Sequence, residues 1–140
     1  MKEIVILLSL VLLSGCKENN NSMKKIIFLH HSTGYTVWLG KTNNYLYKFT
    51  GKGDVQKYIE KHNRKNKTSY RTSERFFPNK EPYGWKNYPY DYYNIWVKNA
   101  GDKPFMEEAT LEILTKEYDL IIFKHCFPVS RIQPDTGTPA

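Results

Sequence analysis

The sequence predicts an α/β protein built around a parallel β-sheet. Residues 24–29 and 119–123 each hold a continuous apolar run, which is typical of a strand covered on both faces. Polar residues follow each run at once, and ligands of parallel sheets gather at the carboxyl ends of the strands. A helical pattern leads directly into the second run, which is the αβ half of a βαβ unit.

Two helices are expected between these strands. The first begins at Asp54, a residue type that caps helices, and its apolar face comprises Val55, Tyr58, Ile59 and His62. The second has Pro104 in its first turn, acidic residues near its positive end and Lys116 near its other end. Its apolar side comprises Met106, Ala109, Ile113 and Leu114.

Residues 63–101, approximately, have little periodicity and are rich in aromatic side chains. Tyrosine and tryptophan rings can stack on sugar faces, so Trp85 and Tyr88 are candidate substrate-binding residues. The alternative, which we favour for most of these rings, is a satellite core that holds a long insertion in place.

The chain carries a formal net charge of +7, and its lysines are scattered among tyrosines and asparagines. Basic surfaces with interleaved aromatic residues can bind single-stranded nucleic acid. We expect instead a solvated basic surface and no nucleic-acid partner, because the N-terminus directs the protein out of the cytoplasm. Attraction to anionic lipid or polysaccharide is the other option.

The N-terminus has the pattern of a bacterial lipoprotein signal. An apolar stretch too short to span a bilayer ends in Leu13-Ser14-Gly15-Cys16, which resembles the lipobox that signal peptidase II reads. Residues 1–15 are therefore expected to be a signal peptide, Cys16 the lipidated residue, and residues 16–23 a polar tether. The expected location is the cell envelope, outside the cytoplasm, at the outer membrane or cell surface.

Two alternatives to this interpretation remain. The apolar stretch could be a buried strand or helix that happens to end in cysteine, and Met23 could be an internal start that yields a cytosolic protein. If Cys16 carries lipid, Cys126 is left alone and no internal disulfide can form. A free cysteine after a strand is usually a small buried hydrophobe.

Ser32 is the candidate nucleophile because it follows the first strand, in His30-His31-Ser32-Thr33-Gly34. A serine on a tight turn at a strand end exposes its hydroxyl, and backbone N–H groups of the turn can stabilise an oxyanion. The alternative is a turn serine that caps the next helix. The two histidines before it, together with His125, could also form a zinc site, but no spaced ligand pattern supports one.

The segments 26–34 and 118–128 together resemble the SGNH/GDSL-type hydrolases, and more closely a divergent branch found in bacterial lipoproteins and secreted proteins. The resemblance implies a flavodoxin-like three-layer α/β/α fold and esterase, deacetylase or lipase activity. It implies that Ser32 is the nucleophile, that Gly34 matches a backbone oxyanion position, and that His125 lies where the family places an oxyanion-hole asparagine.

The chain departs from that family in two ways. It contains neither Gly-x-Asn-Asp nor Asp-x-x-His, the motif that carries the family's catalytic base and its orienting acid. Residues 24–140 are therefore interpreted as the N-terminal part of such a domain, with later βα units missing and the insertion at about 63–101.

The sequence as a whole predicts a lipid-anchored ester hydrolase acting on an acylated glycan or lipid, without a metal or cofactor. We expect these residues alone to be inactive, with His125 as a possible polar partner of Ser32. The competing hypothesis is a non-catalytic surface lipoprotein that binds glycans through Trp85 and Tyr88.

Overall fold

The structure is a computed structural model that describes residues 22–83 and 88–125 of the 140-residue chain. A three-stranded parallel sheet lies at its centre, in the order β2-β1-β3. The strands are β1 (Lys24–His30), β2 (Tyr70–Phe76) and β3 (Leu120–Phe123). The predicted α/β class with a parallel sheet is confirmed, and this order matches the first three strands of the flavodoxin-like order 2-1-3-4-5.

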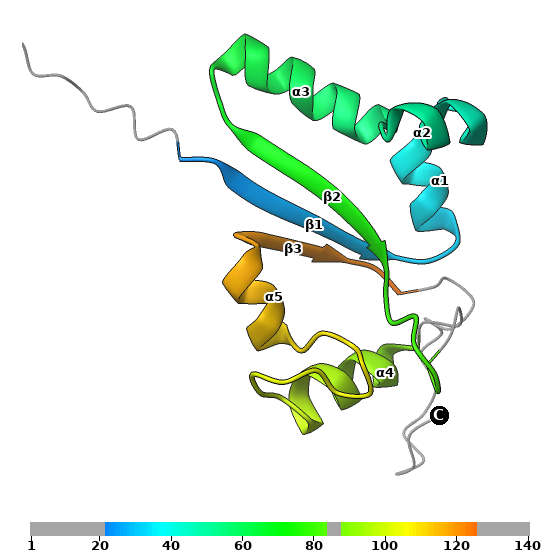
Figure 1. Ribbon diagram of the computed structural model, residues 1–140, viewed down its shortest axis with the longest axis vertical. Helices are drawn as coiled ribbons and strands as arrows, with labels where there is room; N and C mark the ends of the chain where they lie inside the picture. Colours follow the sequence, from blue (N-terminus) through cyan, green and yellow to red (C-terminus); the bar gives the residue numbers. More distant parts are fainter. Residues whose placement is uncertain (1–21, 84–87, 126–140) are drawn as a thin grey trace, which may run out of the picture.

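Helices lie on both faces of the sheet (Figure 1). The segment from β1 to β2 contains α1 (Thr33–Leu39), α2 (Asn44–Thr50) and α3 (Asp54–Asn66) on one face. The segment from β2 to β3 contains α4 (Pro89–Tyr93), the π-helix η1 (Asn94–Lys98) and α5 (Leu111–Glu117) on the other. The chain thus crosses from β1 to β2 over one face and returns to β3 over the opposite one. This reversal makes the gap between β1 and β3 a topological switch point.

The main core lies under α4, η1 and α5. Ile27 and Leu29 of β1 are fully buried there, and they alternate with side chains that point to the other face. The remaining buried members of the core are Phe77, Tyr83, Tyr92, Ile95 and Leu114. Three of these seven residues are aromatic side chains of the insertion, which therefore contributes to the main core rather than to a satellite cluster.

The face under α1 and α3 is less completely covered. Trp38 is buried there, but Val37 is 63% exposed and Ile122 of β3 is 45% exposed. An apolar cavity of about 240 Å³ lies between the sheet and these helices. Its lining includes Ile26, Phe28, Val55, Ile59 and Ile122.

Strand β2 and the start of α5 differ from the sequence prediction. Strand β2 reads YRTSERF, which contains no apolar run, and none of its side chains is buried. Helix α5 begins at Leu111 rather than near Pro104. Met106 and Glu107 have positive φ values of 47° and 64°, which a helix cannot contain, and Phe105 pairs with Glu108 in a tight turn.

The first predicted helix is present as α3, but Asp54 is its first residue and Gly53 its N-cap. The carboxylate of Asp54 instead accepts hydrogen bonds from the backbone N–H of Lys41 (2.7 Å) and the Thr42 hydroxyl (2.6 Å). Asp54 therefore ties α3 to the loop before α2. Of the predicted face, Val55 and Ile59 meet the sheet, whereas Tyr58 is 71% exposed.

Several predicted sites lie outside the described residues: the signal peptide with Cys16, the candidate sugar-binding Trp85, and Cys126. Within residues 22–83 and 88–125, no helix is both long and apolar enough to cross a membrane.

Candidate functional site

Ser32 lies on a β-turn directly after the central strand. The turn runs from His31 to Gly34 and is closed by a 2.9 Å hydrogen bond from the Gly34 N–H to the His31 carbonyl. Ser32 has φ 46° and ψ −113°. These angles are those of the first central position in a type II′ turn, where glycine is strongly preferred. A serine there holds its backbone in a conformation that L-residues avoid.

The Ser32 side chain is exposed and does not cap the helix. Ser32 occupies the N-cap position of α1, but its hydroxyl makes no capping hydrogen bond. An ordinary capping serine has an extended backbone and accepts a bond from the helix N-terminus. The capping alternative is therefore wrong for this serine.

Gly34 is required by the close approach of α1 to β1. A Cβ atom at this position would lie only 2.4 Å from the Cβ of His30. The Gly34 N–H that we expected to face an oxyanion is engaged by the His31 carbonyl. In strained strand-to-helix turns of hydrolases, the oxyanion donor is the N–H of the residue after the serine, which here is Thr33. Thr33 was not among the site residues predicted from the sequence.

His30 is buried beneath the turn and is paired with an acid. Its Nε2 lies 3.1 Å from Oε2 of Glu74 on β2, in an ion-pair contact whose angles are not those of a hydrogen bond. Glu74 also accepts a 3.0 Å hydrogen bond from the Tyr47 hydroxyl, which in turn accepts one from Trp38 Nε1 (3.2 Å). The contacts with His30 and Tyr47 hold the pKa of Glu74 below its usual range, against the opposing effect of burial.

His31 contacts the loop after β2. Its Nε2 lies 2.7 Å from the Pro78 carbonyl, so Nε2 carries the proton in this hydrogen bond. Burial lowers the pKa of His31, and the neighbouring His30 and the charge of Lys124 lower it further. The nearby carboxylate of Glu108 acts in the opposite direction. That carboxylate is itself buried and accepts hydrogen bonds from the backbone N–H groups of Asn79 and Lys80.

His125 packs among aromatic rings at the end of β3. Its ring centroid lies 4.8 Å from that of Tyr92 and 5.8 Å from that of Phe123, both edge-on. Burial, with the charge of Lys124, lowers the pKa of His125, which favours a neutral imidazole that can accept a proton. Among the described residues, no hydrogen bond joins His125 to Ser32, and its Nδ1 is buried without a hydrogen-bond partner.

Lys124 is the residue that the structure adds to this site. Its ammonium donates a 2.7 Å hydrogen bond to the hydroxyl of Thr33, the residue after Ser32. The position of Lys124 at the second strand end is a sequence signal for a site residue. The contact with Thr33 spans 91 residues of sequence, so no local pattern predicts it.

The three histidines have separate partners and do not converge. His30 pairs with Glu74, His31 with the Pro78 carbonyl, and His125 with aromatic rings. Within the described ranges, no group of three or more histidine, cysteine or acidic side chains could hold a metal ion.

Tyr88 is half-buried at the N-terminus of α4, where its backbone N–H donates to the Asp91 carboxylate (3.0 Å). Of its neighbours, Tyr92 is buried, and its hydroxyl donates to the Phe77 carbonyl (3.0 Å). Trp96 stacks on Phe77 with ring centroids 5.4 Å apart. These two rings of the insertion are therefore packing elements, as favoured from the sequence.

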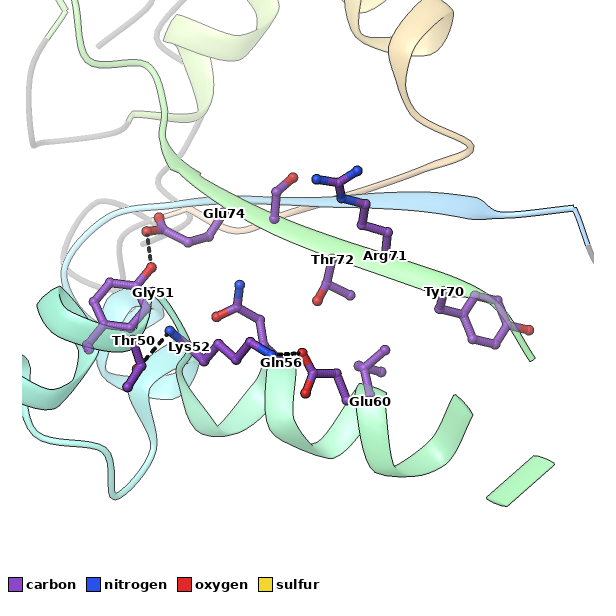
Figure 2. A pocket seen from close by; sticks show the side chains of 12 residues that line it. Thr50, Gly51, Lys52, Gln56, Glu60, Tyr70, Arg71, Thr72 and Glu74 are labelled. Atoms are coloured by element: carbon purple, nitrogen blue, oxygen red, sulfur yellow. Dashed lines mark hydrogen bonds and ion pairs between the residues drawn. The ribbon is translucent and has the colours of Figure 1, made fainter. Parts of the chain in front are cut away.

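A cavity of about 550 Å³ lies between β2 and the α2–α3 region (Figure 2). Lys52 Nζ and Glu60 Oε1 form an ion pair of 2.6 Å at this cavity, and Glu74 reaches it from the strand. None of its lining residues belongs to the Ser32 turn. The cavity meets the strand-end site only through Tyr47 and Glu74, which contact each other and lead to His30.

The fold and the strand ends together define an α/β protein with a strained, exposed serine at its topological switch point. The chain matches no protein-family model, and neither a curated protein nor a solved structure matches it.

Proposed function

We propose that this protein is a lipid-anchored serine hydrolase of the SGNH/GDSL type, with Ser32 as the nucleophile that cleaves an acyl or acetyl ester on a glycan or lipid. The observation that carries the proposal is the positive φ of Ser32 at the end of the central strand, a backbone conformation that favours glycine.

A turn that served only to connect β1 to α1 would favour glycine at this position. Residues held in sparsely populated backbone regions cost about 1–3 kcal/mol and cluster at functional sites. The Ser32 hydroxyl does not offset this cost as a helix cap, and it is exposed to solvent. Strained strand-to-helix turns are where hydrolases place an exposed nucleophilic serine.

The reaction begins when Ser32 Oγ bonds to the carbonyl carbon of the ester. The bond from that carbon to the leaving oxygen breaks, and the serine proton passes through a base to the leaving oxygen. Water then cleaves the acyl-serine, which releases the acid and restores Ser32. Among the described residues, neutral His125 is the candidate proton acceptor, and the Thr33 N–H is the candidate oxyanion donor.

The test uses the complete protein encoded by the reading frame that contains these residues. The Ser32→Ala variant should lose at least about 100-fold in kcat/KM for 4-nitrophenyl acetate, as expected for a nucleophile. Thr36→Ala, at an exposed position of α1, is the matched control and should retain activity. Equal activity of the Ser32→Ala variant and the wild type would remove Ser32 from the mechanism.

The membrane anchor is a separate part of the proposal and rests on the lipobox alone. Cells that express the protein and are fed an alkyne fatty acid should label it, and Cys16→Ala should abolish the label. Labelling that survives this substitution would reject Cys16 as the anchor.

A further inference from the structure

Lys124 lies across the topological switch point from Ser32. It follows β3 directly, and its backbone N–H donates a 3.2 Å hydrogen bond to the Leu29 carbonyl of β1. Its side chain reaches Thr33, where Nζ lies 2.7 Å from the hydroxyl oxygen. Ligands of doubly wound sheets bind in the crevice outside the strand ends at this point. The ammonium therefore lies beside the place where a substrate of Ser32 would bind.

This ammonium has no acidic partner among the described residues, where its one hydrogen-bond acceptor is a neutral hydroxyl. Other lysines of the structure are paired, as Lys24 is with Asp119 (3.0 Å) and Lys116 with Asp102 (2.6 Å). Lys124 is half-buried as a residue, but its contact with Thr33 is exposed, and a hydrogen bond from an ammonium to an anionic group is stronger than one to a neutral hydroxyl.

The surrounding groups do not neutralise this charge. The charge of Lys124 lowers the pKa of both His31 and His125. The carboxylate of Glu108, which acts on His31, is engaged by backbone N–H groups of the loop after β2. Within residues 22–83 and 88–125, the strand ends around Ser32 thus show no acidic group paired with the Lys124 ammonium.

We propose that the substrate of this site is an anionic ester, with a negatively charged group that the Lys124 ammonium binds in place of the Thr33 hydroxyl. The inference rests on the proposed function and adds the charge of the substrate to it. Lys124 is then a specificity-determining residue, because an ammonium discriminates a charged substrate from its neutral isostere.

The experiment compares two esters that differ in this charge, 4-acetoxybenzoate and methyl 4-acetoxybenzoate, with the complete encoded protein. For Lys124→Met, kcat/KM for the anionic ester should fall about 10- to 100-fold, as for a lost charged hydrogen bond. The value for the neutral ester should change less than about 3-fold. Lys124→Arg should largely preserve the ratio, and Lys98→Met, an exposed lysine on η1, should leave both values unchanged.

Binding of the product 4-hydroxybenzoate, followed by calorimetry, gives a second readout and should weaken in Lys124→Met alone. Equal losses on both esters would overturn the inference, since Lys124 would then serve the chemistry and not the charge. Ser32-dependent hydrolysis with no effect of Lys124→Met would also overturn it while leaving the proposed function intact. Both proposals would be rejected if the wild type hydrolysed neither ester and if Ser32→Ala left kcat/KM for 4-nitrophenyl acetate unchanged.

Discussion

Replacing Ser32 by glycine should stabilise the protein while it removes hydrolysis. The backbone of Ser32, with φ 46° and ψ −113°, costs about 1–3 kcal/mol for an L-residue and little for glycine. Glycine loses about 0.5–1 kcal/mol through the greater entropy of the unfolded chain. Because the Ser32 hydroxyl caps nothing, the net gain should be about 1 kcal/mol.

Thermal unfolding followed by circular dichroism measures this gain. One kcal/mol corresponds to a rise in Tm of about 4 °C for a domain of this size. Ser32→Ala is the matched variant, because it also removes the hydroxyl but keeps a Cβ, and its Tm should stay near that of the wild type. A Tm for Ser32→Gly at or below that of Ser32→Ala would refute the strain argument, and retained esterase activity in either variant would refute the nucleophile.

Three further variants test the surrounding structure. Gly34→Ala should lower the unfolding free energy by about 2 kcal/mol in denaturant titrations, since the new Cβ would meet that of His30. Glu74→Gln should flatten the fall in stability below about pH 4.5. The lowered pKa of Glu74 makes its contribution full above its ordinary value of 4.5 and lost as the pH falls through the lower folded value. Leu114→Ala should cost about 2–5 kcal/mol, because this side chain is 1% exposed in the core.

Each of these predictions has a control variant or an outcome that would contradict it. Thr36→Ala, on the same helix as Gly34, should change stability by less than about 0.5 kcal/mol. An unchanged acid limb of the stability profile in Glu74→Gln would show that its pairing with His30 contributes nothing. Val97→Ala, at a side chain that is 62% exposed, should leave the unfolding free energy almost unchanged beside Leu114→Ala.

Continuous apolar runs identified β1 and β3 correctly. The central strand β1 is covered as its run predicts, with Ile27 and Leu29 buried, whereas in β3 Ile122 is 45% exposed although the run is equally apolar. Strand β2 was not predicted because its sequence, YRTSERF, contains no apolar run. The start of helix α5 was predicted too early because Pro104 and the acidic residues after it match the pattern of a helix N-terminus. In the structure, the carboxylate of Glu108 instead accepts hydrogen bonds from the loop after β2.

The sequence by itself determined the α/β class, the parallel arrangement and the location of Ser32 at a strand end, since each follows from local patterns of apolar and polar residues. Only the tertiary structure decided the backbone strain at Ser32, the burial of His30 against Glu74, and the contact of Lys124 with Thr33. The last two features join the end of β1 to β2 and the start of α1 to the end of β3, so they depend on how the crossovers bring distant segments together. No pattern within one segment records such a contact.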